Sequence, residues 1–149
     1  MKKTIHRLFG LAVVLAAALP LRADTPAYDK SLAAADVEKV SGLKDLTRKV
    51  DGRELRFYEG TKLVLNVRFQ GAKAYKLNRE TAEYVKGDVA GVGEAAFYGP
   101  AASPQYVLIF KNKDSCVRVY TCIEKSDPAK TILTVDQLIA VGKIIVSRM

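Results

Sequence analysis

A two-residue alternation of hydrophobic and polar side chains between Asp45 and Gln70 constrains the fold of this chain more than any other feature. Successive side chains of a β-strand point to opposite faces, so this period predicts strands that each bury one face. Asp51-Gly52 separates two of the runs, and such a pair favours a tight hairpin because its central positions prefer positive φ. Gly60 marks a second turn. We therefore predict a three-stranded antiparallel meander.

The C-terminal segment predicts a helix that starts at a defined residue. Thr134 and Gln137 have the spacing of a capping box, in which each side chain satisfies the other residue's backbone N–H. Apolar residues then recur on one helical face, at Leu138, Val141, Gly142 and Ile145. A glycine inside a helix costs about 1 kcal/mol relative to alanine. Gly142 therefore indicates a close approach of this helix to the sheet.

Further elements complete an α+β fold class. A helix is expected over residues 32–40, with Ser31 as N-cap and Gly42 at its end, and a weaker helix over 72–85. A glycine-bounded turn at 89–94 leads into a short strand, and strands are expected at 106–110, covered on both faces, and at 116–123. We predict one domain over residues 31–149: a single antiparallel sheet of about five to six strands with N-terminal, middle and C-terminal helices. Residues 24–30 are expected to be a flexible N-terminal segment.

The first 23 residues have the order of a secretory signal peptide. Basic residues precede an uncharged apolar run over residues 8–21, and Ala23 suits the position before cleavage. This run of 14 residues is too short to cross a bilayer as a helix. We predict cleavage before Asp24, with a cut after Ala18 as the alternative. The mature protein is expected to be periplasmic or extracellular, without a transmembrane anchor.

Charge and composition narrow the class of function. The leader carries four basic residues and no acid, so the net charge of +8 becomes +4 on the 126 residues that remain of 149. These positive charges are dispersed along the chain, whereas a nucleic-acid-binding protein normally shows a dense basic patch. We therefore do not expect nucleic-acid binding. His6, the only histidine, lies in the leader, so the exported domain lacks the usual general base near neutral pH.

Cys116 and Cys122 invite a disulfide in an exported chain, but their spacing opposes an internal Cys116–Cys122 bridge. The residues between them favour a strand, which would hold the two Cα atoms roughly 20 Å apart. A disulfide needs the Cα atoms within about 7 Å. Two free thiols and an intermolecular bridge are the alternatives.

Other short motifs in the sequence do not indicate a catalytic or metal-binding site. Ser41 to Lys44 matches the S-x-x-K string of serine acylases, but this serine ends a predicted helix whereas that chemistry needs it at a helix start. Gly91-Val92-Gly93 precedes a strand rather than the helix that follows a dinucleotide-binding loop, so a turn is favoured, with Glu94 solvated or bound to backbone. Without histidine, a zinc site is disfavoured. We expect no cofactor and no metal.

One group of residues suggests a ligand site. Polar, basic and aromatic side chains alternate with the buried positions of three predicted strands, so they would share the second face of the sheet: Arg56, Tyr58, Asn66, Arg68, Arg118 and Tyr120. Arginines pair with acidic groups, and tyrosines present an apolar ring with a polar tip. Such a face could hold an anionic or carbohydrate ligand. The alternative is a solvated face, or one covered by a helix.

Four segments together resemble a known group of proteins: residues 31–42, 89–96, 106–119 and the helix from Leu133. The pattern is similar to small exported bacterial proteins, mostly uncharacterised, that resemble the α-β-α sandwich of the PsbP and Mog1-like domains. It spans most of the mature chain, but its motifs are loose and transfer no site residue. The resemblance implies a non-catalytic binding or accessory role.

The expected function is therefore that of a soluble envelope protein that binds a partner, either an unidentified protein or an anionic or carbohydrate ligand. A small hydrolase that uses carboxylates or a Ser-Lys pair is the alternative. The absence of histidine and of convergent acidic residues lowers the weight of the hydrolase interpretation.

Overall fold

The computed structural model describes residues 27–81, 85–100, 105–124 and 126–149. The predicted signal peptide and its cleavage site lie outside these residues. So does most of the loop expected at residues 100–104.

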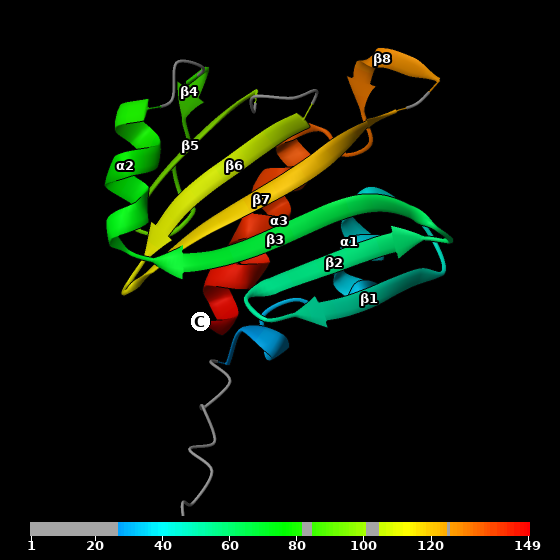
Figure 1. Cartoon of the computed structure of the whole chain (residues 1–149), viewed down its shortest axis with the longest axis horizontal. Helices are drawn as coiled ribbons and strands as arrows, with labels where there is room; N and C mark the ends of the chain where they lie inside the picture. The colour runs from blue at the N-terminus through cyan, green and yellow to red at the C-terminus, as the bar shows by residue number, and fades with distance from the viewer. Residues whose placement is uncertain (1–26, 82–84, 101–104, 125) are drawn as a thin grey trace, which may run out of the picture.

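The described residues form one antiparallel sheet with helices on both faces (Figure 1). Its eight strands follow the order β1-β2-β3-β7-β6-β5-β4, with β8 paired to β7. The strands are β1 (Leu46–Asp51), β2 (Glu54–Glu59), β3 (Lys62–Gly71), β4 (Gly87–Asp88), β5 (Ala95–Pro100), β6 (Gln105–Asn112), β7 (Ser115–Glu124) and β8 (Asp127–Thr131). The helices are η1 (Ala27–Lys30), α1 (Ala34–Ser41), α2 (Lys73–Thr81) and α3 (Val135–Arg148). The α+β fold class with three helices is confirmed, and the sheet has more strands than expected.

The predicted meander forms β1, β2 and β3. Asp51 pairs with Glu54, so the tight turn consists of Gly52 and Arg53, one position later than the Asp-Gly pair itself. Gly52 has φ +57° and Gly60, in the next turn, has φ +58°, which are values that glycine adopts without steric cost. The alternation therefore sets the strands, and the glycines set the turns between them.

Helices α1 and α3 cover one face of the sheet and close the main hydrophobic core. Their buried residues pack against alternate positions of β2, β3, β6 and β7, including Phe57, Phe69 and Phe110. A Cβ on Gly142 would lie 2.8 Å from Leu108 Cδ2, so the close approach predicted for α3 is confirmed. A side chain at that position would therefore have to displace Leu108 or Val92 in the core.

The cap of α3 also ties the two helices together. The Thr134 hydroxyl accepts from Gln137 N at 3.3 Å, and Gln137 Oε1 accepts from Thr134 N at 2.8 Å, which confirms the capping box. Gln137 Nε2 donates to the carbonyls of Val40 and Ser41 at the end of α1. One side chain thus satisfies the start of α3 and the end of α1.

Helix α2 packs on the opposite face, over one part of the sheet. Its residues Ala74 and Tyr75 lie against a second, smaller cluster of Phe97, Val107, Ile109 and Cys116. Strand β6 is therefore covered on both faces, as its consecutive apolar residues predict. The face opposite α1 and α3 remains open beyond α2 (Figure 1).

Residues 27–30, within the segment expected to be flexible, form η1, and Tyr28 stacks on Phe69 with ring centroids 4.3 Å apart. The N-cap expected for the first helix is wrong. Ser31 is not the N-cap of α1. Its buried hydroxyl donates to the Tyr28 carbonyl at 2.6 Å, and Ala33 takes the N-cap position with Asp36 accepting from its N–H at 2.8 Å. The αL conformation of Gly42 after α1 agrees with the prediction.

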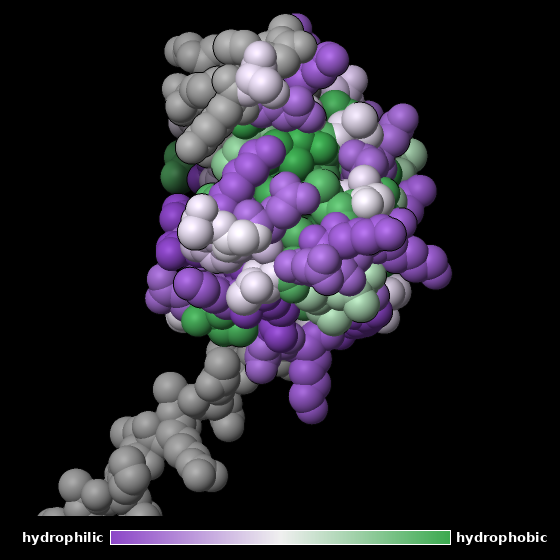
Figure 2. Space-filling model, turned by 90° about the vertical axis from the view of Figure 1, so that its right-hand side faces the viewer, coloured by the Kyte–Doolittle hydropathy of each residue, from purple (hydrophilic) through white to green (hydrophobic). Residues whose placement is uncertain are grey.

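Much of the surface seen from the side of the molecule is hydrophilic, with hydrophobic side chains visible between the charged ones (Figure 2). Among the described residues, the exposed large hydrophobic side chains are Val50 and Leu77, at 47% and 62%. No helix within the described ranges is long and apolar enough to span a membrane.

Candidate ligand-binding face

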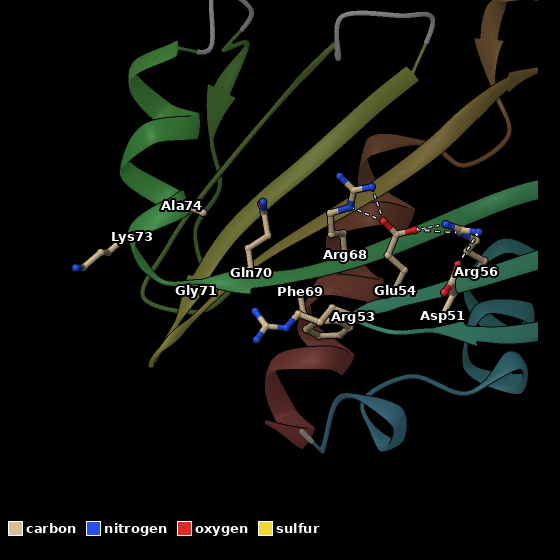
Figure 3. Close-up of a pocket in the computed structure, with 10 residues that line it drawn as sticks. All are labelled: Asp51, Arg53, Glu54, Arg56, Arg68, Phe69, Gln70, Gly71, Lys73 and Ala74. Atoms are coloured by element: carbon tan, nitrogen blue, oxygen red, sulfur yellow. Dashed lines mark hydrogen bonds and ion pairs between the residues drawn. The ribbon is translucent and has the colours of Figure 1, made fainter. Parts of the chain in front are cut away.

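The open face of β2, β3 and β7 carries a charged cluster centred on Glu54. This carboxylate is 11% exposed and lies between two arginines, as Figure 3 shows. Its Oε2 accepts from Arg56 Nε at 3.0 Å and from Arg56 Nη2 at 2.7 Å, and its Oε1 accepts from Arg68 Nε at 2.5 Å and forms an ion pair with Arg68 Nη2. Arg56 Nη1 also lies 3.2 Å from an Asp51 carboxylate oxygen. Both guanidinium groups are therefore held in fixed orientations.

The register of the strands explains this cluster. Glu54 pairs with Arg68 across β2 and β3, and Arg56 lies two residues along the same face of β2. Directly opposed and diagonal positions on one sheet face are close enough for long side chains to meet. The hairpin at Gly60 thus brings Glu54 and Arg68 side by side although they are far apart in the sequence.

Glu54 stays ionised near neutral pH. Burial acts to raise the pKa of its carboxyl group, but the hydrogen bonds from Arg56 and Arg68 outweigh burial, so the pKa lies below its ordinary value. A general acid needs a raised pKa to hold its proton near neutral pH. Glu54 is therefore suited to orient the two arginines and not to donate a proton.

A shallow hollow of about 680 Å³ opens beside this cluster. Strand β3 runs past the end of β2, and the protruding residues, the β1–β2 turn and the first turn of α2 surround the space. The lining residues are Asp51, Arg53, Glu54, Arg56, Arg68, Phe69, Gln70, Gly71, Lys73 and Ala74 (Figure 3). Four cationic side chains against two carboxylates give this hollow a positive balance.

A second hollow of about 240 Å³ lies further along β3. Leu63, Asn66, Arg68, Tyr120 and Cys122 line it, so it combines an amide, a cation and an aromatic ring. Arg68 borders both hollows. The two hollows therefore adjoin along the open face of the sheet.

The structure brings most of the predicted site residues together. Arg56 and Arg68 line the larger hollow, and Asn66, Arg68 and Tyr120 line the smaller one. Arg118 pairs with Arg68 across β3 and β7 and lies over the Tyr120 ring at 4.8 Å, so it supports the face without lining either hollow. Tyr58 borders neither hollow, and Lys49 Nζ lies over its ring at 5.1 Å.

Glu54, the residue that organises the cluster, was not predicted as a site residue. The alternation could have identified it, because Glu54 lies two positions before Arg56 in β2 and so belongs to the same face. Arg53, Gln70 and Lys73 were also missed. They border the hollow because β3 continues beyond the residue paired with the first residue of β2, and because α2 begins just after β3. No local sequence pattern specifies either feature.

Several polar atoms of this face are buried without a hydrogen-bond partner among the described atoms. They are the Asn66 and Gln70 side-chain oxygens and Arg118 Nε. Asn66 Nδ2 donates to Glu54 at 3.5 Å, which leaves its oxygen as the unpaired acceptor. Unpaired buried polar groups are costly, so a hydroxyl or other polar group that reached these atoms would stabilise them.

The alternative hydrolase motifs lie elsewhere and have structural roles. The Ser41 hydroxyl donates to the Val37 carbonyl at 2.7 Å at the end of α1, and Lys44 is exposed beyond Gly42. Glu94 accepts from Lys111 Nζ at 2.6 Å and from Lys113 N at 3.0 Å, as a backbone-bound surface carboxylate does. Within the described ranges no three of His, Cys, Asp and Glu cluster as a metal site would require.

The Gly91-Val92-Gly93 segment forms the turn that was predicted. Gly91 and Gly93 have φ +74° and +61°. A Cβ on Gly93 would lie 2.3 Å from the Lys111 carbonyl oxygen. The glycines are therefore required by the backbone, and no helix follows them to receive a phosphate.

Both cysteines are free thiols on β7. Cys116 is buried beneath α2, and burial raises the pKa of its thiol to about 11. Cys122 is half-buried at the smaller hollow, and burial raises its pKa as well. Neither thiol is activated as a nucleophile.

Comparisons with protein-family models, with curated proteins and with solved structures gave no significant match to this chain.

Proposed function

We propose that this protein is an exported, non-catalytic binding module that holds an anionic or carbohydrate ligand on the open face of its sheet. The observation that carries the proposal is the Glu54 cluster, in which one buried carboxylate fixes two arginines beside an open hollow. Arg56 and Arg68 keep 36% and 46% of their side chains exposed, so both remain accessible to a ligand.

Preorganisation supports this proposal. Arginine side chains normally lose conformational freedom when they bind, and that loss weakens affinity. Here the contacts with Glu54 have already ordered both guanidinium groups in the free protein. An acidic group that enters the hollow would therefore meet donors that are in place.

The test compares wild-type protein with the triple variant E54Q/R56Q/R68Q. Removing the arginines alone would leave Glu54 as a buried, unpaired charge, which destabilises a fold strongly. The triple variant avoids this and lowers the net charge by one. K143Q, at an exposed residue of α3 on the covered side, is the control with the same change of charge.

Binding would be measured by isothermal titration calorimetry with citrate, poly-L-glutamate and polygalacturonate as probes. We expect at least one probe to bind wild type and K143Q equally, and the triple variant about tenfold more weakly, as loss of a charged contact predicts. Circular dichroism would verify that the variant is folded. If no probe binds, or if the triple variant binds as wild type does, the proposal is wrong.

A further inference from the structure

We infer that the open face binds an acidic oligosaccharide that lies along β3, with its carboxylates at Arg56 and Arg68 and a sugar ring in the hollow beside Tyr120. This inference rests on the proposed function and names the class of ligand for the same face. Its support comes from the extent of the hollows, the chemistry of their lining and the presence of carboxylates among their cations.

The extent of the site favours a chain over a single small anion. The residues of β3 that line the two adjoining hollows extend from Leu63 to Gly71, and at 3.3 Å per residue this stretch spans roughly 26 Å. One carboxylate or one sugar ring would fill only part of that length. A ligand with several linked units can contact both hollows at once, and each further contact then becomes intramolecular.

The lining favours a ligand rich in hydroxyl groups. A hydroxyl both donates and accepts, and amide side chains are matched to it because they do the same. Gln70 lines the larger hollow and Asn66 the smaller, and the side-chain oxygen of each lacks a donor among the described atoms. Tyr120 and Leu63 add apolar surface for the carbon-bound hydrogens of a ring.

The carboxylates in the larger hollow argue against a nucleic acid. A nucleic-acid strand carries a charge about every 3.4 Å and binds to surfaces dense in cations. Asp51 and Glu54 would lie among such phosphates and repel them. A chain with one carboxylate per sugar unit carries more widely spaced charges, so fewer of them would lie beside Asp51 and Glu54, which stand among the cationic residues of the hollow (Figure 3).

Membrane headgroups fit less well than a soluble glycan. A protein that lies on a bilayer normally inserts apolar side chains as well as placing cations on the surface. Of the large hydrophobic residues described, Val50 and Leu77 are the exposed ones, and neither lines the hollows. The arginine cluster therefore has no apolar anchor within it.

The experiment is titration calorimetry with hexamers and monomers of galacturonate and of alginate uronates. The same hexamers with methyl-esterified carboxylates test the charge, and inorganic phosphate tests for a simple anion site. A 12-base single strand of DNA and vesicles of phosphatidylserine in phosphatidylcholine test the other macromolecules.

We expect at least one acidic hexamer to bind about tenfold or more tightly than its monomer, as linked contacts predict. Methyl esterification and the E54Q/R56Q/R68Q substitutions should each weaken that hexamer by about tenfold, while K143Q should not. N66A should also weaken the hexamer, because Asn66 lines the hollow that holds the sugar ring.

The outcomes separate this inference from the proposed function. If phosphate or monomers bind as tightly as hexamers, or if DNA or vesicles bind more tightly than every acidic hexamer, the glycan inference fails while an anion-binding face stands. If no uronate, phosphate, DNA or vesicle binds, and the probes used to test the proposed function also fail, both are wrong.

Discussion

At the scale of single residues, Cys116 and Cys122 show how position along one strand changes the chemistry of a side chain. Both belong to the same face of β7, since they lie six positions apart in the strand. Cys116 lies under α2, where Asn78 Nδ2 is 3.9 Å from its sulfur, whereas Cys122 borders the open hollow. The two thiols therefore differ because α2 covers Cys116 and does not cover Cys122.

We predict that iodoacetamide at pH 8 modifies Cys122 of the native protein and leaves Cys116 unmodified. Reaction requires a thiolate and access, and burial both raises the Cys116 pKa to about 11 and blocks the reagent. Peptide mass spectrometry after timed alkylation would measure each site. In 6 M guanidinium chloride, both cysteines should react at about the same rate. Equal rates in the native protein would contradict this account.

Position in the fold also determines the charged contacts of Glu54. In the sequence it is one acid in a β-strand, and in the fold it accepts hydrogen bonds from two arginines of different strands. The alternation predicts the sheet face to which Glu54 belongs, but its contact with Arg68 depends on the register of β2 with β3.

At the scale of elements, Thr121 joins two strands to the start of α3. Its buried hydroxyl donates to the Val64 carbonyl at 3.2 Å and accepts from Leu133 N at 3.0 Å. These bonds connect β7 with β3 and with the residue that precedes the capping box. A single polar group in the core therefore holds the residue before the cap of α3 against the sheet.

We predict that T121V lowers the free energy of unfolding by about 1 to 3 kcal/mol. Valine has nearly the same shape as threonine, so the loss measures the two hydrogen bonds and not a cavity. Urea unfolding followed by circular dichroism would measure it. T47V, at an exposed position of β1, is the matched control and should change stability by no more than about 0.5 kcal/mol. Equal effects of T121V and T47V would refute the prediction.

The elements differ in how well local sequence specifies them. Helix α3 was predicted with its cap and its buried stripe, because capping box, period and dipole all act within one segment. The start of α1 was predicted wrongly, because Ser31 satisfies its hydroxyl with the Tyr28 carbonyl of η1. Strand β8 was not predicted, since its pairing with β7 places it in the sheet without an apolar alternation of its own.

At the scale of the whole molecule, carboxylate and cation pairs link segments that are distant in the chain. Arg148 near the C-terminus forms two hydrogen bonds with Asp36 of α1, at 2.5 and 2.8 Å, and Glu54 joins β2 to β3. Hydrogen bonds from Arg148 lower the pKa of Asp36, and the pKa of Glu54 also lies below its ordinary value. These carboxyl groups release their protons more readily in the folded state than in the unfolded state.

Stability should therefore fall as the solution is acidified. A group with a lowered folded pKa stabilises the fold fully above its unfolded value, and loses that contribution as pH falls from the unfolded toward the folded pKa. The ordinary values are 4.5 for Glu54 and 3.8 for Asp36, so the loss should begin below about pH 5. Urea midpoints at pH 7.0 and pH 3.5 would measure it.

The variant E54Q/R56Q/R68Q isolates the share that belongs to the open face. It lacks the titrating carboxylate and both of its partners, so its urea midpoint should decrease less between these two pH values than that of wild type. K143Q should decrease as wild type does. A decrease in the triple variant equal to that of wild type would show that Glu54 is not linked to folding in this range.

The sequence by itself determined the strands of the meander, the glycines of its turns, the C-terminal helix and which side chains share a face, because periods of two and 3.6 and the conformational freedom of glycine act locally. It therefore placed Arg56, Asn66, Arg68 and Tyr120 on one surface. Only the tertiary structure decided that α2 covers one part of that surface and leaves the rest open, and that Glu54 lies between Arg56 and Arg68. Those outcomes depend on strand register and helix packing, which join residues that no local pattern connects.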